Sequence, residues 1–143
     1  MKALYALASL AALCSCANQP QGLTLNQLET SQYEVTERSR LPVDFAAVQQ
    51  NLFRHAAVCH QTYVFQMEPR ESSYADVVYR PQPGDGWDKS VVLHLVLLQN
   101  RTVDVKAYSY RPGQMERVHK MLTAIMKPDS CGVDNSWENK MDL

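Results

Sequence analysis

The stretch SVVLHLVLLQNRTVDVKAYSY (residues 90–110) contains two runs of apolar and β-branched residues that are separated by a short polar sequence. Runs of this length and composition are typical of β-strands when turn residues bound them. Asn100-Arg101 between them predicts a tight connection, and therefore an antiparallel hairpin. Its register decides which side chains enter the core, because a one-residue shift exchanges the two faces of a strand.

Side-chain chemistry selects the register of this hairpin. A two-residue turn would set Leu95 opposite Lys106, whereas a three-residue loop over 99–101 sets Leu95 opposite Val105 and His94 opposite Lys106. We choose the second register because it separates the apolar and polar side chains of both strands more completely. The predicted core face then contains Leu93, Leu95, Leu97, Val103, Val105 and Ala107.

The segments on either side of the hairpin predict the remaining architecture. Apolar residues spaced three and four apart predict amphipathic helices over residues 45–58 and 113–126. Strand-like runs occupy residues 62–67 and 73–79, and a Pro- and Gly-containing loop follows over 80–89. The sequence therefore predicts an α+β fold: helix, four-stranded antiparallel meander, helix, in two layers with both helices on one sheet face.

The first residues of the chain indicate export. Lys2 precedes an apolar run from Ala3 to Leu13, and small residues follow, which is the order of a secretory signal peptide. The run is too short to cross a bilayer, which requires about 20 apolar residues. A buried N-terminal helix remains the alternative interpretation.

Leu13-Cys14-Ser15-Cys16 resembles the lipobox of bacterial lipoproteins, in which a Leu lies three residues before the modified Cys and a small residue lies directly before it. The resemblance covers only the first 17 residues. It implies that residues 1–15 are cleaved and that Cys16 becomes an N-palmitoyl and S-diacylglyceryl cysteine. Cys14 fits less well, because the bulky Leu13 precedes it. Ala17 after the Cys implies an outer-membrane protein that faces the periplasm.

The mature chain divides into three parts by composition. Residues 16–40 are polar and predict a lipidated N-terminus with a flexible tether. Residues 41–134 form the single predicted α+β domain, and residues 135–143 form a polar C-terminal tail. The formal net charge of −1 gives no electrostatic reason to expect nucleic acid as a partner.

Cys59 and Cys131 are the two cysteines that remain after the anchor. An exported protein meets an oxidising compartment, so the sequence predicts a disulfide between them, with two buried free thiols as the alternative. This bond would close a loop of 72 residues and contribute up to about 4 kcal/mol to stability in the chain-entropy model.

Two groups of residues suggest chemistry, and neither is sufficient to predict it. His55, Cys59 and His60 form a His/Cys cluster, but no fourth ligand is evident and Cys59 is expected to pair with Cys131. His94 lies among polar residues of the outer strand face without a nucleophile or carboxylate-pair motif. We therefore predict no metal ligand, no cofactor and no catalytic residue.

Aromatic residues of the strands and the long loop suggest a binding surface, because Tyr and Trp are enriched in interfaces. The candidate surface contains Tyr79, Trp87, His94, Tyr108 and Tyr110. The sequence thus favours a membrane-anchored, non-catalytic accessory that binds another envelope protein. The alternative is a binder of a small ligand or cell-wall fragment that uses the open sheet face and loop 80–89.

Overall fold

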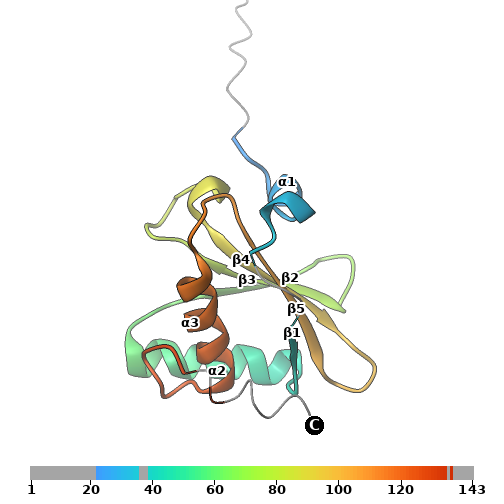
Figure 1. The fold of residues 1–143 in the computed structure, drawn as a ribbon. Helices are drawn as coiled ribbons and strands as arrows, with labels where there is room; N and C mark the ends of the chain where they lie inside the picture. The colour runs from blue at the N-terminus through green and yellow to red at the C-terminus, as the bar shows by residue number, and fades with distance from the viewer. Residues whose placement is uncertain (1–21, 36–38, 135, 137–143) are drawn as a thin grey trace, which may run out of the picture.

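The computed structural model of the protein describes residues 22–35, 39–134 and 136 (Figure 1). It contains a five-stranded antiparallel sheet and three α-helices, which confirms the predicted α+β class with an antiparallel sheet. The predicted count of four strands and two helices is corrected by two further elements near the N-terminus. Residues 1–15, Cys16 and the tail other than Ser136 lie outside the described residues.

All neighbouring strands of the sheet are antiparallel. The strand order is β1 (Ser39–Leu41), β5 (Val103–Ser109), β4 (Val91–Leu97), β3 (Tyr74–Tyr79) and β2 (Val64–Met67). The unpredicted strand β1 pairs with β5, and its Leu41 lies opposite Val103 and is fully buried in the core. Three residues are too few to produce a recognisable alternation of apolar and polar residues, so this strand could not be predicted from the sequence.

The predicted hairpin register is confirmed in β4 and β5. Leu95 pairs with Val105, and His94 pairs with Lys106. The backbone N–H of Leu98 donates to the carbonyl of Thr102, and Arg101 adopts a left-handed backbone with φ of 61°. The connection therefore has the three-residue form that sorts the side chains onto two faces.

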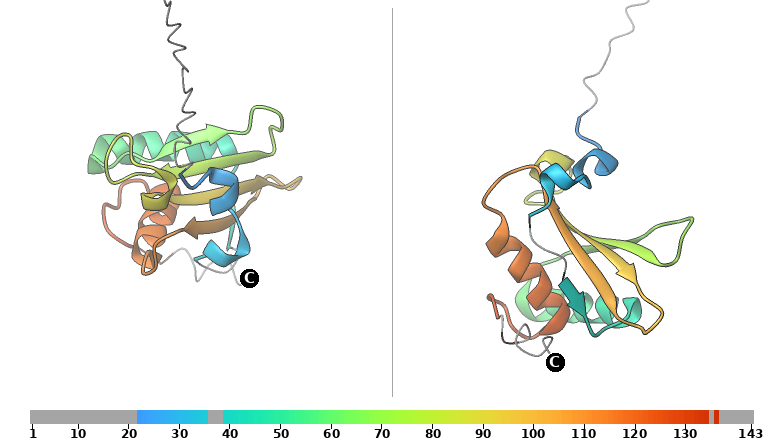
Figure 2. Two further views of the ribbon diagram at one scale, coloured as in Figure 1. Left: turned by 90° about the horizontal axis from the view of Figure 1, so that it is seen from above. Right: turned by 45° about the vertical axis from the view of Figure 1, so that its right-hand side comes forward.

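Two helices cover one face of the sheet, which we call the inner face (Figures 1 and 2). Asp44 is the N-cap of helix α2 (Phe45–Cys59), and its carboxylate accepts a hydrogen bond from the N–H of Ala47 at 3.0 Å. Helix α3 (Met115–Met126) contributes a strongly amphipathic second element. Their apolar side chains pack with the inner face of β4 and β5 and form the main core.

The opposite face of the sheet, the outer face, is covered by the short helix α1 (Leu25–Leu28) (Figure 1). Thr24 and Gln27 form a capping box at the start of this helix. Leu28 is fully buried against Val78, Val92 and Tyr108. Residues 22–35 and 39–41 are thus part of the folded domain, which corrects the flexible tether predicted over residues 16–40.

Within residues 22–35 and 39–134, none of the helices has the length and hydrophobicity that crossing a bilayer requires.

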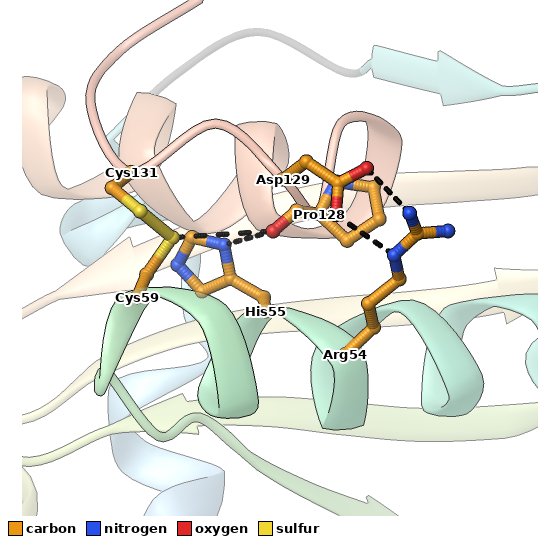
Figure 3. The surroundings of a disulfide bond; sticks show 6 residues. All are labelled: Arg54, His55, Cys59, Pro128, Asp129 and Cys131. Carbon is orange, nitrogen blue, oxygen red and sulfur yellow. Dashed lines mark hydrogen bonds and ion pairs between the residues drawn. A yellow bond between two sulfur atoms is a disulfide. The ribbon is translucent and has the colours of Figure 1, made fainter.

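A disulfide joins Cys59 at the end of α2 to Cys131 in the segment after α3, as predicted (Figure 3). Two further contacts lie beside it. The Nδ1 of His55 lies 3.0 Å from the carbonyl oxygen of Pro128, and the guanidinium of Arg54 binds both carboxylate oxygens of Asp129 at 2.8 and 2.7 Å. The segment that leaves α3 is therefore held on α2 by covalent and polar contacts together.

Replacing both Cys59 and Cys131 with Ser should lower the free energy of unfolding by about 2–4 kcal/mol, because the bond constrains a 72-residue loop in the unfolded chain. Urea unfolding of both proteins measures the difference. Reductant should destabilise the unsubstituted protein and leave the double variant unchanged. If the unsubstituted protein unfolds at the same urea concentration with and without reductant, the disulfide contributes nothing to its stability.

Candidate functional site

Three titratable side chains meet on the outer face, between α1 and the strands β3 and β4. The Nδ1 of His94 lies 2.9 Å from Oδ1 of Asp76 and 3.4 Å from Oε1 of Glu29. The side chains of His94, Asp76 and Glu29 are 26%, 17% and 19% exposed. We call these three residues the His94 cluster.

Strand pairing and helix docking build this cluster. Asp76 and His94 are directly opposite each other in the β3–β4 ladder, so their side chains leave the same face as close neighbours. Glu29 follows α1 as its C-terminal cap residue, and the burial of Leu28 beside it holds Glu29 over the sheet. The ring of Tyr74 stacks on the imidazole with centroids 5.7 Å apart.

The two carboxylates determine the charge of His94. The hydrogen bond to Asp76, followed by the ion-pair contact with Glu29, raises the pKa of His94 to about 9, although burial opposes the charged form. Burial in turn raises the pKa of Glu29. At neutral pH the imidazole is therefore protonated, and it joins α1 to the sheet through charge-assisted contacts.

The side-chain atoms around His94 determine which chemistry the His94 cluster can support. In the described residues no Ser, Thr or Cys side chain hydrogen-bonds to His94, so the arrangement lacks the nucleophile–base pair of covalent catalysis. One imidazole nitrogen and two carboxylate oxygens do lie within 4.8 Å of one another, which is a donor set that a metal ion can use. The cluster is therefore suited to holding a proton or a cation.

The five residues of the predicted aromatic surface do not form one continuous surface. Tyr79 lies on the inner face, where the guanidinium of Arg117 sits 3.9 Å from its ring centroid. Trp87 lies in the short 3-10 helix η2 (Trp87–Lys89). It packs against the outer-face cluster that contains Leu28 of α1 and Tyr108. Tyr110 is 51% exposed. Its ring lies against that of Tyr33, with centroids 5.4 Å apart. The physical reason is strand alternation, which places Tyr79 and His94 on opposite faces.

The outer face is also less open than the sequence suggested. Leu28 covers Val78 and Val92, and loop 80–89 contacts α1 through η2. Within that loop the carboxylate of Asp85 accepts from the backbone N–H of Gln82 at 2.9 Å and from the amine of Lys89 at 3.2 Å. A ligand site on the bare sheet would first require α1 to move away.

The predicted His/Cys cluster on α2 is occupied by other interactions. Cys59 is bonded to Cys131 and offers no thiolate, and the Nδ1 of His55 contacts the carbonyl of Pro128. His60 follows the helix in a left-handed backbone conformation. The sequence missed the His94 cluster instead, because its members lie at positions 29, 76 and 94 and show no motif spacing.

A second candidate surface lies on α2, on the side turned away from the sheet. Phe53 is 80% exposed there, although a large aromatic side chain usually avoids water. Its exposed neighbours by helical spacing carry no charge. We define the α2 patch as Ala46, Gln49, Gln50, Phe53 and Ala57. Charged side chains at its borders are paired with each other, as in Arg54–Asp129 and Arg101–Asp44.

The pKa of His94 should be measurable by NMR in the presence of a chelator, with about 9 as the expected value in the folded protein. Asp76→Asn removes the main hydrogen-bonding carboxylate and should lower this pKa towards 6.5. The pKa of His94 is higher in the folded protein than in the unfolded chain, so protonation of His94 stabilises the folded state. This stabilisation is complete below about pH 6.5 and is lost as the pH rises through about 9. A midpoint of His94 near 6.5 in the unsubstituted protein would contradict the described contacts.

Comparison of the chain with protein-family models and with curated proteins gives no match. What the protein does must therefore be inferred from the chemistry and placement of its residues. Two features are available for that inference: the His94 cluster on the outer face and the α2 patch on the inner-face helix.

Proposed function

We propose that the protein is a lipid-anchored, non-catalytic domain of the bacterial cell envelope that binds another envelope protein through the α2 patch. The observation that carries this proposal is the 80% exposure of Phe53 on an uncharged helix face. An exposed aromatic residue among uncharged side chains, with the bordering Arg54 paired to Asp129, has the composition of an interface core.

The anchor is proposed from the resemblance of Leu13-Cys14-Ser15-Cys16 to a lipobox. Cys16 precedes Gly22, the first described residue, by six positions. Six residues span at most about 20 Å in any conformation, so an anchored Cys16 keeps the α1 side of the domain near the membrane. Three acyl chains would make the attachment effectively permanent, because each buried CH₂ contributes about 0.8 kcal/mol.

The placement of α2 supports a protein partner rather than a lipid surface. Helices α1 and α2 cover opposite faces of the sheet, and Figure 1 and the right-hand view of Figure 2 show them at opposite ends of the domain. With α1 close to the membrane, the α2 patch faces away from it. The occupant of the patch is then a protein of the same compartment.

The chemistry of the α2 patch defines the matching surface of the partner. Burying Phe53 in an apolar pocket contributes about 2–3 kcal/mol. The small side chains of Ala46 and Ala57 permit close approach on either side of the ring, and Gln49 and Gln50 supply amide hydrogen bonds at the rim. We expect the partner to present an uncharged apolar pocket bordered by hydrogen-bonding groups.

The remaining features of the site favour binding over catalysis. His94, the strongest candidate for proton transfer, is held between two carboxylates and contacts no nucleophile among the described residues. The chain has nearly balanced charge, with 14 basic and 15 acidic residues, and so offers no strong field for steering a charged substrate.

Cys16→Ser should move the protein from the membrane fraction to the soluble periplasmic fraction, because no acyl chain remains to be buried. Immunoblotting of separated fractions measures the distribution. Cys14→Ser is the matched control and should leave the protein on the membrane. The anchor assignment is overturned if the Cys16 variant stays bound or if the Cys14 variant is the one released.

A photo-crosslinking residue at position 49, within the α2 patch, should capture one defined envelope protein in intact cells. Phe53→Ser in the same chain should reduce the adduct about tenfold or more, because the buried ring supplies much of the binding free energy. The variant should fold normally, since exposed substitutions typically change stability by less than about 0.5 kcal/mol.

Tyr110→Ser is the control for removing an exposed aromatic residue elsewhere, and it should leave the adduct unchanged. A crosslinking residue at the exposed position 82 on loop 80–89 should not yield the same product. If the adduct at position 49 persists at full strength in the Phe53 variant, the α2 patch is not the binding surface.

A further inference from the structure

We infer that Glu29, Asp76 and His94 form a binding site for a divalent transition-metal ion, for which Zn²⁺ is the best-matched candidate. The inference concerns the outer face and is independent of the α2 patch and of the lipid anchor. It begins from three side chains that come from α1, β3 and β4 and converge on one point.

The separations of the donor atoms are close to those of a tetrahedral zinc site, since all three atoms lie within 4.8 Å of one another. Nδ1 of His94 is 2.9 Å from Oδ1 of Asp76 and 3.4 Å from Oε1 of Glu29. Zinc bonds to His nitrogen and carboxylate oxygen are about 2.0–2.1 Å long, which places neighbouring ligand atoms of a tetrahedron about 3.3–3.4 Å apart. Small side-chain movements would therefore let all three residues bind one ion, with a fourth position left for water.

A second observation at the same place concerns the carboxylate of Glu29. The Oε1 atom of Glu29 is buried, and among the described residues its contact with Nδ1 of His94, at 3.4 Å, does not have the geometry of a hydrogen bond. A buried carboxylate oxygen with only this one long polar contact is incompletely compensated, and a metal ion bound between the three side chains would give it a close ligand bond.

The charge balance of the cluster also favours a divalent ion. The cluster contains two carboxyl groups, Glu29 and Asp76, and one imidazole, so a single proton on His94 is not enough to balance two carboxylates. Lys106 lies opposite His94 in the ladder, but its amine pairs with Glu34 at 3.6 Å. A divalent cation that replaces the proton on Nδ1 would balance both carboxylates.

The donor types select the class of metal. Mg²⁺ and Ca²⁺ prefer sites made entirely of oxygen ligands, whereas an imidazole nitrogen with carboxylate oxygens suits Zn²⁺ and its neighbours in the first transition row. The stacking of Tyr74 on the imidazole helps to fix the orientation of His94. A bound ion would link α1 to β3 and β4 and hold the N-terminal segment on the sheet.

Thermal unfolding of the full chain in mild detergent tests this inference. The protein is first freed of metal with a chelator, and Zn²⁺ is then added to about 100 times its apparent Kd. The melting temperature should rise by about 5–10 °C, because the ion binds the folded state alone. The same concentration of Mg²⁺ should change it little.

Variants locate the binding. Glu29→Gln, Asp76→Asn and His94→Gln should each abolish the Zn²⁺-dependent shift. Glu34→Gln, on the same N-terminal segment, and His119→Gln, on α3, are matched controls that should retain it. Circular dichroism in the absence of metal checks that each variant is folded.

X-ray absorption of the zinc complex of the unsubstituted protein gives a measurement that does not depend on variants. It should show nitrogen and oxygen ligands at about 2.0–2.1 Å with the scattering of one imidazole. The inference is overturned if the unsubstituted protein shows no shift, if Glu29→Gln and Glu34→Gln respond equally, or if the spectrum contains sulfur or several imidazoles.

Discussion

The register of the β4–β5 hairpin is the constraint on which the rest of the structure depends. Setting Leu95 opposite Val105 directs one row of apolar side chains to the inner face, where α2 and α3 find their packing surface. The same register places His94 and Tyr108 on the outer face. A shift of one residue would bury His94 in the main core and expose Leu95, so the two faces acquire their different roles from this pairing.

The outer face acquires its chemistry from a segment that looks unstructured in the sequence. Helix α1 has only four residues and could not persist alone, but Leu28 fills an apolar hollow between Val78, Val92 and Tyr108. That docking brings Glu29 to within 3.4 Å of His94. The burial of Leu28 therefore both covers the outer face of the sheet and brings Glu29 to the candidate cation site.

The structure could be predicted correctly from the sequence where the local residue pattern agrees with burial in the core. Helix α2 begins at Phe45, where the predicted helix over residues 45–58 begins, the hairpin register is confirmed, and the disulfide joins Cys59 to Cys131. The sequence was insufficient for β1 and α1, since three- and four-residue elements show too little periodicity to be recognised. The predicted aromatic surface is divided because adjacent positions of a strand point to opposite faces, which separates Tyr79 from His94.

By itself the sequence determined the α+β class, the hairpin register, the cysteine pair and the resemblance of residues 13–16 to a lipobox. These features depend on neighbours in the chain or on simple counting, so they can be derived without coordinates. Only the tertiary structure placed Glu29 and Asp76 beside His94, because positions 29, 76 and 94 meet solely through strand pairing and the docking of α1. Likewise, only tertiary packing left Phe53 exposed, because the sheet against which a helix packs determines which face of the helix is buried.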